Sequence, residues 1–412
     1  MNGTRVDIAI VGAGPAGTTT ALCIRRSIPE MSILLIDSAD FPRDKACGDA
    51  VGPTAVKVYR KLGLETALFA HSKRVSSGRV IGPDGIEFVA GFGSSSEVNV
   101  YGFIQPRIQF DAKLVQACRS AGVEVRTGTV VKSCVRNGQM WRINLAGSED
   151  CVEAPIVIGA DGANSIVRKS LGLASLSGRY RALAIRAYGE WSASSRRLGS
   201  EELLVVYEPA IAPVYGWVFP LADGSVNIGV GFLEVDIRKG DPNLKRQLGR
   251  FLSVLDHKGF VFENLRGEQG HSLPLGNSKL PIHDNGAFLV GDAAGMINPL
   301  SGEGVSYLAR AAELIADYLS RVSLADLRKG ELHDAERLYG EAFRAEYRRH
   351  FKSNYWATRA LGRRRIGKLI FRAAERSSAT RAYGVDLMFG EACFDIRAGL
   401  SVLKGLLHAS SK

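Results

Sequence analysis

The chain has 412 residues, 46% of them hydrophobic, and a formal net charge of +11. This length can bury a substantial core, which we expect to divide into two or three lobes. The six cysteines include no Cys-x-x-Cys pair and no His–Cys cluster, which argues against a disulfide framework and against a metal site. No apolar stretch approaches the length of a membrane span, and no secretion signal precedes the first apolar run. A cytoplasmic protein is therefore predicted.

The positive charge is concentrated near the C-terminus. Residues 341–381 contain twelve Lys or Arg and three Glu, and apolar residues recur among them every three or four positions. Amphipathic helices with basic faces are expected there. Those faces are either solvated or in peripheral contact with an anionic membrane surface. Nucleic acid is not an expected partner, because no recognised binding module accompanies the charge.

The first predicted elements are a strand, a glycine-rich turn, a helix and a second strand. Residues 6–11 are apolar and mostly branched, residues 18–26 can form a helix, and residues 33–36 are again apolar. This order is that of a βαβ unit, so an α/β fold is predicted.

The turn of this unit carries the segment Gly12-Ala13-Gly14-Pro15-Ala16-Gly17. Glycine is needed where the chain turns sharply, where the backbone approaches a pyrophosphate, and where a helix packs closely on a strand. The N-terminus of the helix then offers free N–H groups to the phosphates. Asp37 ends the second strand, 20 residues beyond Gly17, where a carboxylate can accept a hydrogen bond from a ribose hydroxyl. A dinucleotide site is predicted, but the motif alone does not separate NAD from FAD.

The middle of the chain contains a helix that opens at Arg107, followed by strands. The predicted elements are a helix over residues 109–121, antiparallel strands within 123–135 and 139–145, a buried strand over 156–158, and a helical run over 164–171. Asp161-Gly162 follows the buried strand, a position that is commonly just a turn.

The second half is predicted to be β-rich and then helical. The expected elements are strands at 203–207, 215–220 and 225–232, a helix near 242–256, a buried strand over 287–290, and helices beyond residue 302. The nucleotide-binding elements are thus interrupted by a β-rich portion, which excludes a simple two-domain dehydrogenase.

The strand over 287–290 leads into Gly291-Asp292 and then Gly302-Glu303-Gly304. The strand would deliver Asp292 to its C-terminal end, where a carboxylate can accept hydrogen bonds from a ribityl chain. A helix starting near Gly302 would direct its positive end at a flavin and favour the negative charge of the reduced ring.

The Gly12–Gly17 turn, Asp161-Gly162 and Gly291-Asp292 follow one another along the chain. In this order, the three motifs resemble those of the p-hydroxybenzoate-hydroxylase superfamily of FAD enzymes. The resemblance implies FAD as the cofactor, with Arg107 directed at it, Asp161 at an FAD and NAD(P)H contact, and Asp292 at the ribose or ribityl chain. It also implies a Rossmann-type FAD-binding domain with an inserted antiparallel-sheet substrate domain. We expect the FAD-binding domain over residues 1–75, 100–178 and 268–320, the β-rich domain over 76–99 and 179–267, and a basic C-terminal helical segment over 321–412.

A narrower resemblance begins in the loop 42–53. Its Cys47-Gly48-Asp49 resembles the Cys-Gly-Asp loop that geranylgeranyl reductases place beside the flavin. A free cysteine is most often a small core residue. Here Arg43 and Lys45 flank it and would lower the thiol pKa if they are close in space. Arg43, Cys47 and Gly48 are therefore candidate cofactor contacts.

The second stretch is Tyr215-Gly216-Trp217-Val218-Phe219-Pro220, followed after eight residues by Gly229-Val230-Gly231. Alone, it predicts a β-hairpin whose aromatic residues belong to the core. As a pattern it resembles a substrate-contact signature of geranylgeranyl reductases at every defined position. That resemblance covers residues 6 to about 319 and makes Tyr215, Trp217, Phe219, Pro220, Gly229 and Gly231 candidate substrate contacts.

The family resemblance implies hydride transfer from reduced flavin N5 to a prenyl double bond, with Cys47, or a water held by its loop, as the proton donor. Tyr215, Trp217 and Phe219 alternate along a strand and share one face, which suits an isoprenoid or terpenoid substrate. The alternative is a monooxygenase that hydroxylates or epoxidises a terpenoid or aromatic compound, since both activities use this scaffold. NAD(P)H or a ferredoxin would supply the electrons, and the sequence leaves the oligomeric state open.

Overall fold

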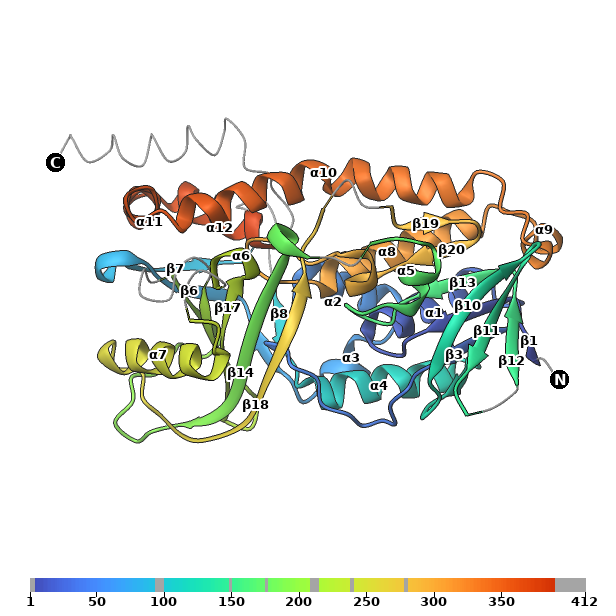
Figure 1. The fold of residues 1–412 in the computed structure, drawn as a ribbon. Helices are drawn as coiled ribbons and strands as arrows, with labels where there is room; N and C mark the ends of the chain where they lie inside the picture. The colour runs from blue at the N-terminus through green and yellow to red at the C-terminus, as the bar shows by residue number, and fades with distance from the viewer. Residues whose placement is uncertain are drawn as a thin grey trace.

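The computed structural model describes residues 4–92, 100–147, 150–174, 177–207, 215–237, 241–277 and 281–389. Parts of two predicted segments, 93–99 and 390–412, lie outside the described residues. The strands gather in two main sheets, and a long helix, α10, runs along one side of the molecule past both (Figure 1).

The first main sheet has six strands in the order β19-β20-β13-β2-β3-β9. All neighbours are parallel except β19 and β20. The inner strands are buried along their whole length because other elements cover both faces. The strands are β2 (Ile8–Val11), β3 (Ile33–Ile36), β9 (Glu124–Arg126), β13 (Ile156–Gly159), β19 (His283–Asp284) and β20 (Ala287–Leu289).

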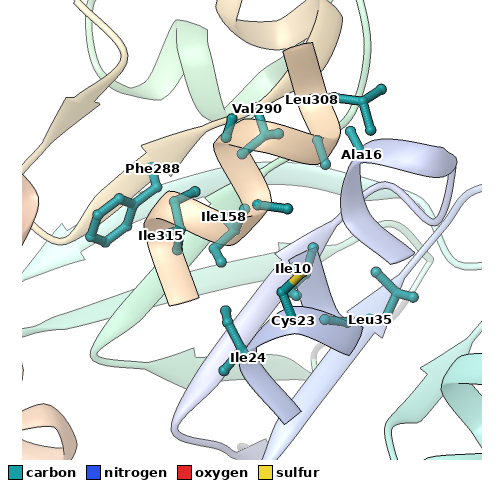
Figure 2. Packing of buried hydrophobic residues seen from close by; sticks show 14 of the residues in the cluster. Ile10, Ala16, Cys23, Ile24, Leu35, Ile158, Phe288, Val290, Leu308 and Ile315 are labelled. Carbon is teal, nitrogen blue, oxygen red and sulfur yellow. The ribbon is translucent and has the colours of Figure 1, made fainter. Parts of the chain in front are cut away.

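Two helices from opposite ends of the chain pack on this sheet and on each other, α1 (Pro15–Ser27) and α8 (Val305–Leu319). Figure 2 shows the resulting core, in which Ile10 and Ile158 of the strands lie near Ile24 of α1 and Ile315 of α8. The helix α4 (Arg107–Ser120) packs beside α1. The C-terminal half of the sequence therefore completes the nucleotide-binding core begun by the first forty residues.

A four-stranded sheet lies next to this core, in the order β1-β12-β11-β10, and the short helix α5 (Ile166–Ser170) packs on β10. The Trp141 indole of this sheet donates a hydrogen bond of 2.9 Å to the Asn285 carbonyl, which ties it to the β19–β20 turn. Its strands are β1 (Thr4–Arg5), β10 (Val131–Asn137), β11 (Met140–Leu145) and β12 (Cys151–Ala154).

The second main sheet has seven strands in the order β18-β14-β17-β16-β15-β6-β7 and is antiparallel except between β15 and β6. The helix α7 (Leu244–His257) covers one face through Phe251 and Leu255. The other face presents aromatic and aliphatic side chains towards the first sheet. The strands are β6 (Ser77–Ile81), β7 (Glu87–Gly91), β14 (Arg181–Trp191), β15 (Glu202–Val206), β16 (Gly216–Pro220), β17 (Val226–Leu233) and β18 (Phe262–Pro274).

A separate small sheet has three strands in the order β4-β8-β5. Near the C-terminal end of the described chain, α10 packs on α11, and α11 packs on α12. The strands of the small sheet and the remaining helices are β4 (Ala50–Val51), β5 (Lys73–Val75), β8 (Gly102–Ile104), α2 (Pro53–Lys61), α3 (Glu65–Phe69), α6 (Glu234–Ile237), α9 (Leu324–Lys329), α10 (Ala335–Leu361), α11 (Arg364–Arg376) and α12 (Ser378–Phe389). Across the described part of the chain, no helix combines the length and the apolar character needed to span a membrane.

Several strands were not predicted from the sequence, among them β5, β8 and β12. β18, the longest strand, was not predicted, and the expected domain boundary at residue 268 falls inside it. β18 is an edge strand, most of its residues are exposed, and it contains Gly267 and Gly270. An exposed edge lacks the apolar alternation by which strands are recognised in a sequence.

Candidate active site

A cavity of about 610 Å³ lies between the two main sheets. It is lined by the carboxyl ends of β2, β3 and β13, by the loop 43–50, by the start of α8, and by β14, β15, β16 and β18. Ligands of open α/β sheets bind at the carboxyl ends of the strands. Its size is within the range of cofactor and small-molecule sites.

The glycine turn at one end of this cavity has no room for side chains at two positions. A Cβ atom on Gly12, whose φ is +102°, would lie 2.3 Å from the Ala160 carbonyl oxygen. A Cβ on Gly17 would lie 1.8 Å from the Gly12 oxygen. A Cβ on Gly14, by contrast, would lie 3.5 Å from a guanidinium nitrogen of Arg43 and 3.9 Å from one of Arg107, which are ordinary contact distances. The turn at Gly14 therefore lies close to two cations.

Asp37 directly follows β3 and lies beside this same turn. Its carboxylate accepts backbone hydrogen bonds from Ala13 at 2.7 Å and Ala39 at 2.9 Å, which holds it at the cavity wall. The Arg43 guanidinium lies 4.0 Å from Asp37 and 3.4 Å from the buried Asp111.

Arg107 opens α4 and pairs with the same Asp111 through two hydrogen bonds of 2.6 and 2.7 Å. Burial opposes its charge, but the coulombic and hydrogen-bonding effects of Asp111 outweigh burial and raise its pKa. The cation expected at the cofactor is thus present in the cavity lining, held by a carboxylate that the sequence reasoning did not single out.

Cys47 lines the cavity and is half-buried. Burial raises the pKa of its thiol, and Arg107 offsets this only in part, while Asp49 adds to the increase. The thiol is therefore protonated at neutral pH, the form that a proton donor requires.

The condition under which Arg43 and Lys45 would lower the thiol pKa is not met, because their charged groups are directed at carboxylates and not at the thiol. The Arg43 guanidinium is directed at Asp37 and Asp111, and the Lys45 ammonium lies 3.7 Å from Asp292. Neighbours in sequence extend in different directions in this loop, and the cation that reaches the thiol is Arg107 of α4.

A buried asparagine that the sequence reasoning missed holds the Cys47 loop in place. Asn227 of β17 donates hydrogen bonds of 2.7 Å to the Cys47 carbonyl and of 2.7 Å to Asp49 Oδ2. Its Oδ1 accepts a 2.9 Å hydrogen bond from the Trp217 indole. A signal was available, because Asn227 is the one polar residue in the strand Val226–Leu233 and lies within the spacer of the aromatic signature.

Asp49 forms the centre of this network. Besides Asn227, it accepts a 2.8 Å hydrogen bond from the Tyr188 hydroxyl and a 3.1 Å hydrogen bond from the Arg107 backbone N–H. Burial raises its pKa to about 6, against the effect of these hydrogen bonds. The third residue of the Cys-Gly-Asp loop thereby connects the loop to α4 and to two strands of the second sheet.

The aromatic signature forms a wall of the cavity. The rings of Tyr215, Trp217 and Phe219 follow one another at centroid distances of 6.1 and 6.2 Å, and all three are buried. A Cβ on Gly229 would lie 2.1 Å from Trp217, so glycine there makes room for the indole. Gly48 lies against the wall, since a Cβ on it would lie 3.1 Å from Phe219. The two stretches that carry the narrower resemblance are thus in contact.

Two predicted carboxylates meet different partners. Asp161 accepts a 2.6 Å hydrogen bond from the Ile166 backbone N–H with one oxygen, while its buried Oδ1 has no partner within the described residues. Asp292 lies 3.7 Å from Lys45 and 3.8 Å from His271. Burial opposes its ionisation, but Lys45 and then His271 outweigh burial and lower its pKa.

The Gly302-Glu303-Gly304 segment also lines the cavity and lies against the aromatic wall. Gly302 has a φ of +69°, and a Cβ there would lie 3.0 Å from the Tyr215 hydroxyl. Glu303 accepts a 2.7 Å hydrogen bond from the Ser306 backbone N–H at the start of α8. Burial raises the Glu303 pKa to about 7. Sequence reasoning recognised the glycines but not this titratable carboxyl.

Most of the predicted site residues line this one cavity. Those that line it are Gly12, Gly14, Pro15, Ala16, Asp37, Arg43, Cys47, Gly48, Arg107, Asp161, Tyr215, Trp217, Phe219, Asp292, Gly302 and Gly304. Those outside its lining are Gly17, Pro220, Gly229, Gly231 and Gly291. Gly17 and Gly229 lie behind it and provide space for the turn and for Trp217.

The cavity wall changes from polar to apolar along β14 and β18. Arg186 of β14 pairs in register with Gln269 of β18, and the next inward-facing pair is Ala184 with His271. The buried Arg186 forms a 2.6 Å ion pair with Asp44 of the Cys47 loop. The apolar end is lined by Leu203, Val205, Leu273, Ile297, Met388 and the aromatic wall.

The last described helix contributes to this apolar end. Met388 of α12 lines the cavity, and its carbonyl accepts hydrogen bonds from Ser301 Oγ at 2.8 Å and Asn298 Nδ2 at 3.1 Å. Among the described residues, no set of three or more His, Cys, Asp or Glu is arranged to hold a metal ion.

Comparison with known proteins agrees with this geometry. An FAD binding domain family matches residues 5–199. A menaquinone reductase of Mycolicibacterium smegmatis is 31% identical over 78% of each chain. A geranylgeranyl diphosphate reductase of Rhodobacter capsulatus is 32% identical over 80% of this chain and 78% of its own. The chain belongs to the geranylgeranyl reductase family.

The solved structures agree with the family fold. A geranylgeranyl bacteriochlorophyll reductase-like protein from Thermoplasma acidophilum has a TM-score of 0.75 and 20% identity, over 98% of this chain and 96% of its own. Flavin-dependent halogenases and a hydroxylase share the fold as well. The solved structures therefore support the fold of FAD-dependent oxidoreductases, and the relatives of 31 and 32% identity assign the family within it.

The cavity of this family member fits FAD. The turn at Gly14, with the guanidinium groups of Arg43 and Arg107 close to it, suits a pyrophosphate. The carboxylate of Asp37, in the same cavity lining, offers an acceptor for a ribose hydroxyl. These groups come from the same FAD-binding region that the family match covers, and the cavity continues from them to Cys47 and the aromatic wall.

Proposed function

We propose that the protein reduces carbon–carbon double bonds of a prenyl chain. The observation that carries the proposal is the contact between the Cys47 loop and the aromatic wall inside one cavity. FAD, once reduced, supplies a hydride at its N5 atom, and a proton must reach the other carbon of the double bond. The reduction therefore needs an apolar surface for the chain and a protonated group beside it.

The side chains of this cavity meet both needs. Tyr215, Trp217 and Phe219 bind and orient an apolar chain and exclude water from it. Cys47 holds a proton on Sγ at neutral pH because burial raises the thiol pKa. Asn227 fixes the loop that carries this thiol. The names of two relatives mention geranylgeranyl diphosphate and menaquinone. Both compounds contain a prenyl chain, and they are the substrates to test first.

The electron donor is a second part of the proposal. The cavity lining also contains Lys45, Arg186 and His271, which suit an anionic donor such as NAD(P)H, and Lys45 lies close to Gly162. A ferredoxin is the other donor to test. We also propose a cytoplasmic location for the enzyme. Anaerobic mixing of the oxidised enzyme with NADH, NADPH or reduced ferredoxin, followed at the flavin absorbance, distinguishes these donors.

The deciding experiment is anaerobic incubation of the reduced enzyme with geranylgeranyl diphosphate, menaquinone and prenyl-glycerol lipids. The expected result is reoxidation of the flavin together with a product two daltons heavier for each reduced bond, with the added mass in the prenyl-chain fragments. With menaquinone, mass added only to the ring fragment would show reduction of the quinone instead. The fold is shared with a hydroxylase, so a flavin monooxygenase acting on a terpenoid or aromatic compound is the competing function. Flavin that stays reduced without oxygen, but reoxidises with formation of an oxygenated product in air, would establish that function instead.

A further inference from the structure

A second concavity, of about 710 Å³, lies along one face of α10. It is bounded across from the helix by the turn at Arg179-Tyr180 and by Gly276. Gly276 donates a 2.7 Å hydrogen bond to the carbonyl of Ile297, which lines the flavin cavity. We call this concavity the α10 groove. It shares a stretch of backbone with the catalytic cavity but is lined by a different set of residues.

The α10 groove is strongly positive. Four cations line it, Arg179, Arg344, Arg348 and Lys352, and none of them has an ion-pair partner within the described residues. Other arginines of α10 do have partners: Arg337 pairs with Asp334 and Glu341, and Arg359 pairs with Asp236. Glu341 is the single acid of the lining and is already held by Arg337 at 2.8 Å. A concave surface lined by one sign of charge concentrates the opposite charge from solution.

Aromatic rings lie among these cations. Tyr180 and Tyr355 face each other across the groove at a centroid distance of 5.6 Å, and Trp356 follows at 5.8 Å. Trp356 is 60% exposed, more than any other large hydrophobic residue in the described part of the chain. Exposed tryptophan beside arginine and lysine is the composition found where proteins meet the headgroup region of a bilayer.

We propose that the α10 groove binds the phosphate headgroup of an anionic membrane lipid. Arginine guanidinium groups present paired N–H donors that match phosphate oxygens, and three of the four cations here are arginines. A soluble phosphate ligand would use the same cations but would not account for the exposed Trp356 in the groove lining. A lipid explains both the charge and the exposed indole.

The test is cosedimentation of the FAD-loaded full-length protein with vesicles. The wild type is expected to sediment with vesicles that contain phosphatidylglycerol, and not with phosphatidylcholine alone. Arg348→Ala should weaken this binding about fivefold, and Arg344→Ala with Arg348→Ala more than tenfold. Arg349→Ala is the matched control, because Arg349 is the next residue of the same helix and does not line the groove. It should change the binding about twofold or less.

Three results would overturn the proposal. Equal loss of vesicle binding in Arg348→Ala and Arg349→Ala would show that net charge, and not the groove, attracts the membrane. Absence of vesicle binding by the wild type would remove the lipid ligand altogether. Vesicle binding that is unchanged in the double variant, with pyrophosphate binding by calorimetry lost, would assign the groove to a soluble phosphate. None of these measurements depends on catalytic turnover.

Discussion

The two ends of the flavin cavity are built in different ways. At the nucleotide end, the cavity wall is formed by backbone atoms of one short turn. Gly12 allows the turn to lie against the backbone that follows β13, and Gly17 allows α1 to lie against the turn. At the reacting end, side chains from the loop 43–50, β14, β16 and β17 meet through Asn227 and Asp49. The first end tolerates no added carbon atom at Gly12 or Gly17, whereas the second depends on a few buried hydrogen bonds.

The largest effect is expected at the nucleotide end. In Gly17→Ala, the new Cβ would lie 1.8 Å from the Gly12 carbonyl oxygen, so the turn must move. We expect FAD binding to be lost, or weakened at least a hundredfold, as measured by the flavin content of the purified protein and by titration with FAD. Gly249→Ala is the control, because a Cβ there meets no atom within 4 Å. FAD affinity unchanged in Gly17→Ala would disprove this account of the turn.

The second effect is at the reacting end and should leave FAD in place. Cys47→Ala removes the protonated thiol, and general acid catalysis typically contributes 10²- to 10⁴-fold. We therefore expect kcat for prenyl reduction to fall about a hundredfold or more, with unchanged FAD affinity. Cys151→Ala, at a buried cysteine of β12, controls for the loss of a thiol elsewhere. A Cys47→Ala enzyme with normal turnover would assign the proton to another group.

The third prediction concerns the network that holds the Cys47 loop. Asn227→Ala removes the hydrogen bonds to the Cys47 carbonyl, Asp49 and Trp217. Misplacement of the loop should lower kcat roughly tenfold to a hundredfold with a smaller change in KM. It should also raise the rate at which iodoacetamide modifies Cys47. Asn144→Ala, which breaks a hydrogen bond in the four-stranded sheet, should leave both measurements unchanged. An unchanged alkylation rate in Asn227→Ala would show that the asparagine does not position the loop.

The smallest effect is a change in the pH dependence of stability. Burial raises the Glu303 pKa from 4.5 to about 7, so between these values the folded protein binds more protons than the unfolded chain. Stability contributed by this group is present below pH 4.5 and is lost as the pH rises towards 7. Glu303→Gln should therefore be more stable relative to wild type at pH 8 than at pH 5, by up to about 3 kcal/mol.

Unfolding of the FAD-free proteins by urea at the two pH values measures this difference. A Glu303→Gln difference that is the same at both pH values would show that the carboxyl is not held in a buried environment.

The nucleotide end was predictable because its geometry is local. A strand, a turn of fixed length and a helix place Gly12, Gly14 and Gly17 without reference to the rest of the chain, and Asp37 follows one strand later. The aromatic wall was predictable for a similar reason, since side chains at every second position of a strand share one face.

The contacts between distant segments were not predictable in this way. The partner of the Cys47 thiol is Arg107 rather than its sequence neighbours Arg43 and Lys45, and its loop is held by Asn227, 180 residues away. The edge strand β18 carries no apolar alternation, so only its pairing with β14 identifies it. The sequence alone determined the dinucleotide turn and the aromatic face, because both follow from local periodicity. Tertiary structure decided which charges and hydrogen bonds reach the reacting groups, because these depend on how loops and sheets pack.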